Sequence, residues 1–183
     1  MKRNFTFQLT ACALFAAFTA IAAQFSVPVG PVPISLATFA VYLSGAVLGG
    51  KKGALSQAVY LLLGAAGLPV FAGFHGGVQA LLGPTGGFLV GYVVCAWIVG
   101  TLARKGGRVP RPLPLAGAML LGTAALYALG TGWFLFLTQN GIWAALSLCV
   151  FPFLPGDFAK IAICAFAAPR LAGVFGRISA GAA

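Results

Sequence analysis

Charged residues divide this chain into three long blocks, and this division constrains the fold more than any other feature. Two uncharged blocks run from Asn4 to Gly50 and from Gly53 to Ala103. A third runs from Pro112 to Pro169, with charge only at Asp157 and Lys160. Because one helix needs about 20 residues to cross a bilayer, each block holds two crossings and a turn. The pattern predicts an all-α integral membrane protein with six transmembrane helices.

Composition supports a fully embedded chain. Hydrophobic residues make up 61% of the sequence and charged residues 7%, whereas a soluble domain has roughly 25% charged residues. No stretch is polar enough for a separate soluble domain, so we expect a single membrane domain over residues 1–183. The net charge is +10, but the basic residues lie in short runs between apolar blocks. That pattern is typical of a cytoplasmic membrane edge and argues against nucleic-acid binding.

Proline and glycine mark the connections inside the blocks, because both residues end or kink helices. The first block breaks at SVPVGPVPIS, the second at GLPVFAGFHGGVQALLGPTGG, and the third between Gly130 and Pro155. The second and third spans are short, so we expect them to be tilted or to extend into their loops. The predicted spans are 5–25, 36–50, 53–67, 87–103, 113–137 and 156–175.

The apolar run from Phe5 to Phe25 follows Lys2 and Arg3, as in a signal peptide, but its 21 residues fit a membrane span better. We interpret it as an uncleaved first helix. In a six-span arrangement the basic runs at Lys2, Lys51, 104–111 and 170–177 all fall on one side. The positive-inside rule then predicts that both termini are cytoplasmic in a multi-pass protein of the cell membrane.

The opposite side has long, glycine-rich, apolar loops. Irregular backbone near a membrane must be buried in protein or line a wet cavity. We therefore expect the first two outward loops to fold over a capped binding pocket that is reached from outside the cell.

Asp157 is the only acidic side chain in the sequence, and Lys160 follows it by three residues, on the same face of a helix. One interpretation is that Asp157, after Pro155 and Gly156, caps the last helix and pairs with Lys160. The other is that the two form the polar floor of a ligand pocket. Ionisable side chains inside a membrane are costly and usually functional, which favours the pocket.

His75 and Gln79 lie in the second outward loop, four residues apart, and would share a face if that segment formed a short helix. Gly76 and Gly77 make such a helix uncertain. We expect these four residues to line the pocket and not to bind a metal. The sequence has no catalytic grouping, which predicts that the protein is not an enzyme. It has no ATP-binding motif either, so any active transport would need energy from another protein.

Small residues recur on the first helix, with Ala13 and Ala17 as one pair and Ala16 and Ala20 as another. Such pairs let helices approach closely in lipid. They serve either packing within this chain or docking of a partner helix.

Several of these segments resemble one known family. GLPVF, GPTGG and FPFLPGDFAK are similar to the BioY family, the biotin-specific substrate-binding subunits (S-components) of energy-coupling factor (ECF) transporters, and the likeness runs from about residue 9 to 172. The resemblance implies six helices, no cofactor, and biotin as the ligand. It implies that Asp157 and Lys160 contact biotin and that Ala13 and Ala17 dock on a transmembrane coupling protein. Two cytoplasmic ATPases would complete the transporter.

Two other functions stay open at the level of sequence. The first runner-up is an S-component for another small vitamin, with the same fold and a different pocket. The chain would also fit a membrane assembly protein that transports nothing.

Overall fold

The computed structural model describes the backbone of residues 2–104 and 109–181, and the side chains of residues 6–104 and 109–178. Four basic residues of the sequence analysis are affected. The side chains of Lys2 and Arg3 lie outside the described residues, and so do Lys105 and Arg108 entirely.

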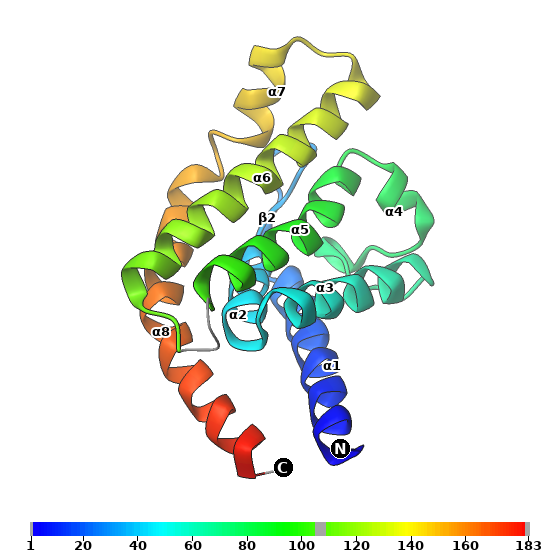
Figure 1. Cartoon of the computed structure of the whole chain (residues 1–183). Coiled ribbons are helices and arrows are strands. Elements are labelled where there is room, and N and C mark those ends of the chain that lie inside the picture. Colours follow the sequence, from blue (N-terminus) through cyan, green and yellow to red (C-terminus); the bar gives the residue numbers. More distant parts are fainter. Residues whose placement is uncertain (1, 105–108, 182–183) are drawn as a thin grey trace.

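The described part of the chain is mostly helical, with one short hairpin (Figure 1). Strands β1 and β2 pair antiparallel, with Ser26 opposite Ser35. The elements in chain order are α1 (Lys2–Gln24), β1 (Ser26–Val27), β2 (Ile34–Ser35), α2 (Ala37–Leu48), α3 (Gly50–Ala65), the 3₁₀ turn η1 (Ala72–Phe74), α4 (Val78–Leu82), α5 (Gly86–Ala103), α6 (Pro112–Thr138), α7 (Ile142–Cys149) and α8 (Leu154–Gly181).

Each predicted span overlaps one of the helices α1, α2, α3, α5, α6 and α8, but the count of six is not confirmed. The described residues form eight α-helices, because the outward loops contain the short helices α4 and α7. Four helices, α1, α5, α6 and α8, are long and apolar enough to cross a membrane. Helix α2 has 12 residues and α3 has 16, or about 18 and 24 Å, which is less than the roughly 30 Å hydrocarbon core.

The two short helices form a tight corner. Gly49 is the single residue between α2 and α3. It has φ +84°, a backbone conformation that favours glycine. The corner lies directly against α5: a Cβ on Gly100 would be 2.3 Å from the backbone nitrogen of Gly50. Nearly every residue of α2 is buried, because α1, α3, α5 and α8 all pack around it. Helix α2 therefore forms the centre of the bundle and has little contact with lipid.

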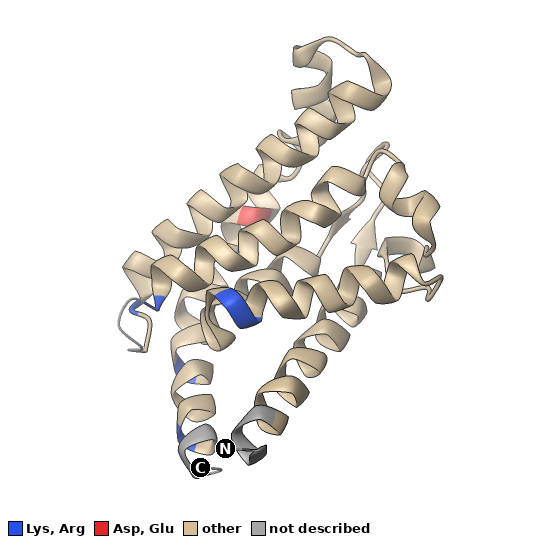
Figure 2. Ribbon diagram, turned by 45° about the vertical axis from the view of Figure 1, so that its right-hand side comes forward, with Lys and Arg blue, Asp and Glu red and all other residues tan. Residues whose placement is uncertain are grey.

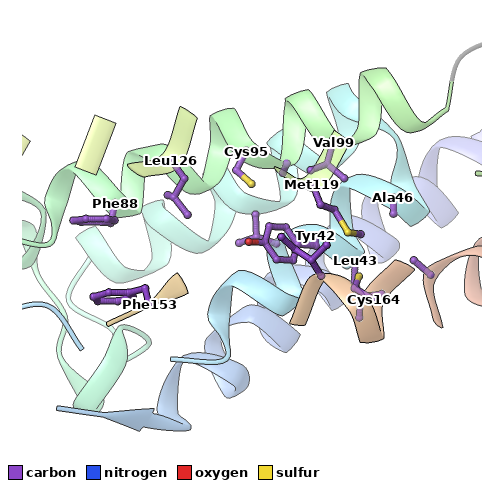
Figure 3. Close-up of a cluster of buried hydrophobic side chains, with 14 of the residues drawn as sticks. Tyr42, Leu43, Ala46, Phe88, Cys95, Val99, Met119, Leu126, Phe153 and Cys164 are labelled. Atoms are coloured by element: carbon purple, nitrogen blue, oxygen red, sulfur yellow. The ribbon is translucent and has the colours of Figure 1, made fainter. Parts of the chain in front are cut away.

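The largest apolar cluster joins α2 to α5, α6 and α8 (Figure 3). Tyr42 of α2 lies at its centre, and its hydroxyl is 2.6 Å from the Thr123 hydroxyl of α6. The rings of Phe88 and Phe153 stack with centroids 6.4 Å apart. Other members of the cluster include Leu43, Ala46, Cys95, Val99, Met119, Leu126 and Cys164.

Helix α1 is held to this body by a buried amide. Gln57 of α3 donates hydrogen bonds to the Thr19 hydroxyl of α1 and the Ser44 hydroxyl of α2, each over 3.1 Å. Both hydroxyls donate in turn to carbonyls of their own helices, at Phe15 and Val41. The amide therefore fixes the three helices at one height relative to one another.

We expect Gly100→Ala to destabilise the fold. The added methyl group would press on the backbone of the α2–α3 corner, and overpacking of this kind costs about 1–3 kcal/mol. The melting temperature in detergent should fall by several degrees.

Gly117→Ala is the matched control for this change. Gly117 is an exposed glycine of α6, and nothing lies within 4 Å of a Cβ added there. This variant should be neutral or more stable, because alanine favours helices over glycine by about 1 kcal/mol. Equal melting temperatures for the two variants would contradict the close contact at Gly100.

Candidate functional site

The start of α8 buries the only carboxylate of the sequence with a lysine. Asp157 is 2% exposed and Lys160 is 8% exposed, and the Lys160 Nζ lies 2.8 Å from the Asp157 Oδ1. In Figure 2 the single red segment, which is Asp157, lies among the helices. The spacing of three residues within α8 brings both side chains to the same face.

Hydrogen bonds from three other elements surround this ion pair. Lys160 Nζ donates to the Ser35 carbonyl of β2 at 2.7 Å and to the Thr38 Oγ1 of α2 at 2.9 Å. Asp157 accepts from the Thr38 hydroxyl at 3.0 Å and from the Tyr127 hydroxyl of α6 at 2.6 Å. An ammonium group has three N–H donors, and all three are used here. The pair therefore links β2, α2 and α6 to α8.

This arrangement bears on whether Asp157 caps the last helix, one of the two interpretations that the sequence left open. Helix α8 begins at Leu154, so Asp157 lies in its first turn, as expected. Its carboxylate, however, bonds side chains of α2, α6 and α8, and no backbone N–H of the described residues donates to it. The pairing with Lys160 is thus confirmed, while the expected capping hydrogen bond is not found. Taking two charges out of water is costly, and it is offset here by complete hydrogen bonding.

A cavity of about 720 Å³ lies directly beside this network. Its volume is in the range of small-molecule sites. Ser35 lines it and also accepts from Lys160, whereas Asp157 and Lys160 lie one layer behind the lining. Its lining combines aromatic rings with hydrogen-bonding groups. It includes Gln24, Ser26, Ser35, Tyr60, Phe71, His75, Gly76, Gln79, Thr85, Phe88 and Tyr92.

Three of the four loop residues chosen from the sequence line this cavity. They are His75, Gly76 and Gln79, while Gly77 is not part of the lining. The expected helical face does not form, because α4 begins only at Val78. His75 is instead in extended backbone, and its carbonyl accepts from the N–H of Phe71 at 2.9 Å. His75 and Gln79 thus reach the same cavity from a turn and from a short helix.

Gln24, the last residue of α1, is a site residue that the sequence analysis missed. Its Nε2 donates to the carbonyls of Val70 and Phe71, each over 3.2 Å, and its Oε1 accepts from the N–H of Phe74 at 3.0 Å. One side chain thus fixes the end of α1 to the loop around η1, which forms one wall of the cavity. The available signal was an amide at the outer end of a mostly apolar span.

Thr38 and Tyr127 were missed as well. Tyr127 could have been found as the one tyrosine of a long, mostly apolar helix, where its hydroxyl needs a partner. Thr38 gave no such signal, because a threonine satisfies its own hydroxyl on helical carbonyls. Only the packing of α2 on α8 identifies it.

The two alanine pairs of α1 lie on different faces. Ala16 is buried in the body of the protein and Ala20 is partly buried, so this pair serves internal packing. Ala13 and Ala17 are exposed on the adjacent face of the helix. The sequence could not separate these two uses, and the structure leaves Ala13 and Ala17 available for contact with another molecule.

Apart from Lys160, the described basic residues gather away from the cavity. Lys51, Arg104, Arg111 and Arg177 lie at or near the ends of helices remote from the β1–β2 hairpin and α4 (Figure 2). This separation agrees with a protein that places its basic end and its cavity toward opposite sides of a membrane.

Comparison with known proteins identifies relatives over nearly the whole chain. The model of the BioY family matches residues 1–177. A biotin transporter BioY of Thermotoga maritima is 43% identical over 164 residues, covering 90% of this chain and 95% of the relative. A probable biotin transporter BioY of Pyrococcus horikoshii is 42% identical, covering 91% and 96%. A crystal structure of the S-component for biotin from an ECF-type ABC transporter matches with a TM-score of 0.82 and 26% identity, covering 93% of each chain. On the family match and these identities, this chain belongs to the BioY family.

Proposed function

We propose that this protein captures biotin from outside the cell and acts as the substrate-specific subunit of an ECF transporter in the cytoplasmic membrane. The observation that carries the proposal is the cavity of about 720 Å³ beside the buried Asp157–Lys160 pair. Membership of the BioY family and the names of the relatives support biotin as the ligand.

Biotin suits the chemistry of this cavity. Its fused rings and aliphatic chain are apolar, and they would lie against Tyr60, Phe71, Phe88 and Tyr92. Its ureido group carries two N–H donors and a carbonyl, and its chain ends in a carboxylate. Glutamine, serine and histidine side chains in the lining offer partners for these groups.

In this proposal Asp157 and Lys160 supply the strongest polar contacts. Because the Lys160 ammonium already uses its three donors, a biotin oxygen must replace one present acceptor. The Ser35 carbonyl is the acceptor nearest the cavity, so binding would move β2 away from Lys160. The loop between β1 and β2 and the segment around His75 and Gln79 would then close over the ligand and cap the pocket.

The remaining parts of the proposal concern assembly and orientation. The chain would act as a single membrane domain in which the buried helix α2 and the short, partly exposed helix α3 complete six crossings. Ala13 and Ala17 would dock on a transmembrane coupling protein, and two cytoplasmic ATPases would supply the energy. Both termini would be cytoplasmic, which agrees with the basic residues at that end.

Asp157→Asn and Lys160→Met are each expected to weaken biotin binding by about one to two powers of ten. A hydrogen bond to a charged group contributes about 1.5–3 kcal/mol, and an amide accepts hydrogen bonds less strongly than a carboxylate. Calorimetric titration of biotin into purified, monodisperse protein measures the change.

Stability must be measured separately, because each change also leaves one buried charge unpaired, at a cost of about 3–5 kcal/mol. Lys51→Met, at an exposed lysine, is the control and should bind biotin normally. Wild-type affinity in both folded site variants would mean that the pair is purely structural. A wild-type protein that binds no biotin would refute the proposed ligand.

Ala13→Leu and Ala17→Leu are expected to leave biotin binding unchanged and to reduce recovery of the coupling protein severalfold. Both residues are exposed, and the larger side chain would hold a partner helix away. Co-purification of the tagged variants with the coupling protein and ATPases gives the measurement. Ala124→Leu, the same change on the exposed face of α6, should assemble normally. Full recovery of the complex with both α1 variants would exclude this docking face.

The proposed orientation is tested by labelling. In a variant whose four cysteines are replaced, Gly106→Cys should resist an impermeant thiol reagent added to intact cells, because residue 106 would face the cytoplasm. Gly106 lies outside the described residues. Asn140→Cys, in the exposed turn between α6 and α7, should react readily as the outward control. The reverse labelling pattern would invert the topology.

A further inference from the structure

A second cavity lies at the other end of the fold from the candidate biotin site. It measures about 180 Å³ and lies between the start of α1 and the end of α8, below the α2–α3 corner. Along α1, Gln8 lines this cavity and Gln24 lines the first one, about 24 Å apart at 1.5 Å per residue. Sites for drug-sized molecules occupy about 300–1,000 Å³, so this cavity is too small for a vitamin but large enough for a single anionic group.

Two cationic side chains contribute to the lining, and neither has an acidic partner. They are Lys52 in the first turn of α3 and Arg104 at the end of α5, both half-buried. The only acidic side chain of the sequence, Asp157, pairs with Lys160. Arg104 donates to the Val47 carbonyl, which leaves most of its five N–H groups available. Burial lowers the pKa of Arg104 below its usual value, the sign of a cation without compensation.

The position of Lys52 adds to this positive potential. Helix α3 begins with Gly50, Lys51 and Lys52, and its first turn contains no acidic residue. A helix N-terminus carries a partial positive charge and normally favours acidic side chains. Two lysines there are unfavourable unless an anion lies close by.

Apart from Gln8, the other walls of the cavity are apolar and continue into the outer surface of the bundle. Phe7 of α1 and Phe175 of α8 line it, and their ring centroids lie 5.4 Å apart. Beside it, Leu9 of α1 and Val174 of α8 are exposed large apolar residues. A molecule bound here would place a charged group on Lys52 and Arg104 and an apolar part along these helices. A soluble anion would make no use of the apolar walls.

We propose that this cavity binds the phosphate group of an anionic phospholipid. Basic pockets between transmembrane helices on the cytoplasmic side are suited to lipid headgroups. The phosphate would accept charge-assisted hydrogen bonds from Lys52 and Arg104. The acyl chains would lie along the apolar outer faces of α1 and α8. Such a lipid would join α1, the α2–α3 corner, the end of α5 and α8 at one point.

The test uses native mass spectrometry of the purified full-length protein with added phosphatidylglycerol, phosphatidylcholine or inorganic phosphate. The wild type should retain one phosphatidylglycerol in preference to phosphatidylcholine. Lys52→Gln and Arg104→Gln should each weaken this binding by about ten- to a hundredfold, the loss expected for one hydrogen bond to a charged group. Lys51→Gln changes the same charge one residue away, at an exposed side chain, and should alter the affinity by less than about twofold.

Each alternative gives a different result. An equal loss in Lys51→Gln would mean general attraction to anionic lipid and would refute a site. Equal retention of phosphatidylcholine, or inorganic phosphate that competes as well as the lipid, would refute a phospholipid site. Arg104→Lys keeps the charge and should retain most of the binding, which separates loss of the site from misfolding in Arg104→Gln. Biotin binding should persist in every folded variant, so this test stands apart from that of the proposed transport function.

Discussion

The buried pair of Asp157 and Lys160 is the interaction on which the rest of the site depends. A carboxylate and an ammonium buried away from water are tolerated only with complete hydrogen bonding. Hydrogen-bonding groups of other elements must therefore lie next to them. Ser35, Thr38 and Tyr127 are those partners, and they belong to β2, α2 and α6. The pair thus fixes the hairpin that forms one wall of the cavity. A ligand that competes for Lys160 would act directly on that wall.

Close backbone contact is the second constraint, and it explains why helices too short to span a bilayer belong in this fold. The α2–α3 corner lies against Gly100 of α5 with no room for a side chain. Helix α2 is buried on almost all sides, so its backbone ends meet protein and loops instead of hydrocarbon. The short helices leave space at both ends of the bundle, and the two cavities lie there.

Helix α1 connects these two ends. Gln24 fixes its last turn to the loop that lines the first cavity, and Gln57 holds its middle at Thr19. Its first turns line the second cavity, and Ala13 and Ala17 remain exposed between them. A shift of this one helix would therefore change the candidate biotin site, the proposed docking face and the proposed lipid site together.

The sequence by itself determined the membrane class, the positions of the six main helices, and the pairing of Asp157 with Lys160, because uncharged length and the spacing of two charges on one helix are local properties of the chain. It also identified His75, Gly76 and Gln79 as pocket residues from one glycine-rich loop. Only the tertiary structure decided that Gln24, Thr38 and Tyr127 belong to the site, and that Ala16 is internal while Ala13 is exposed. Those distinctions depend on which helix faces pack together, and residues more than a hundred positions apart, such as Ser35 and Lys160, meet only once the bundle has formed.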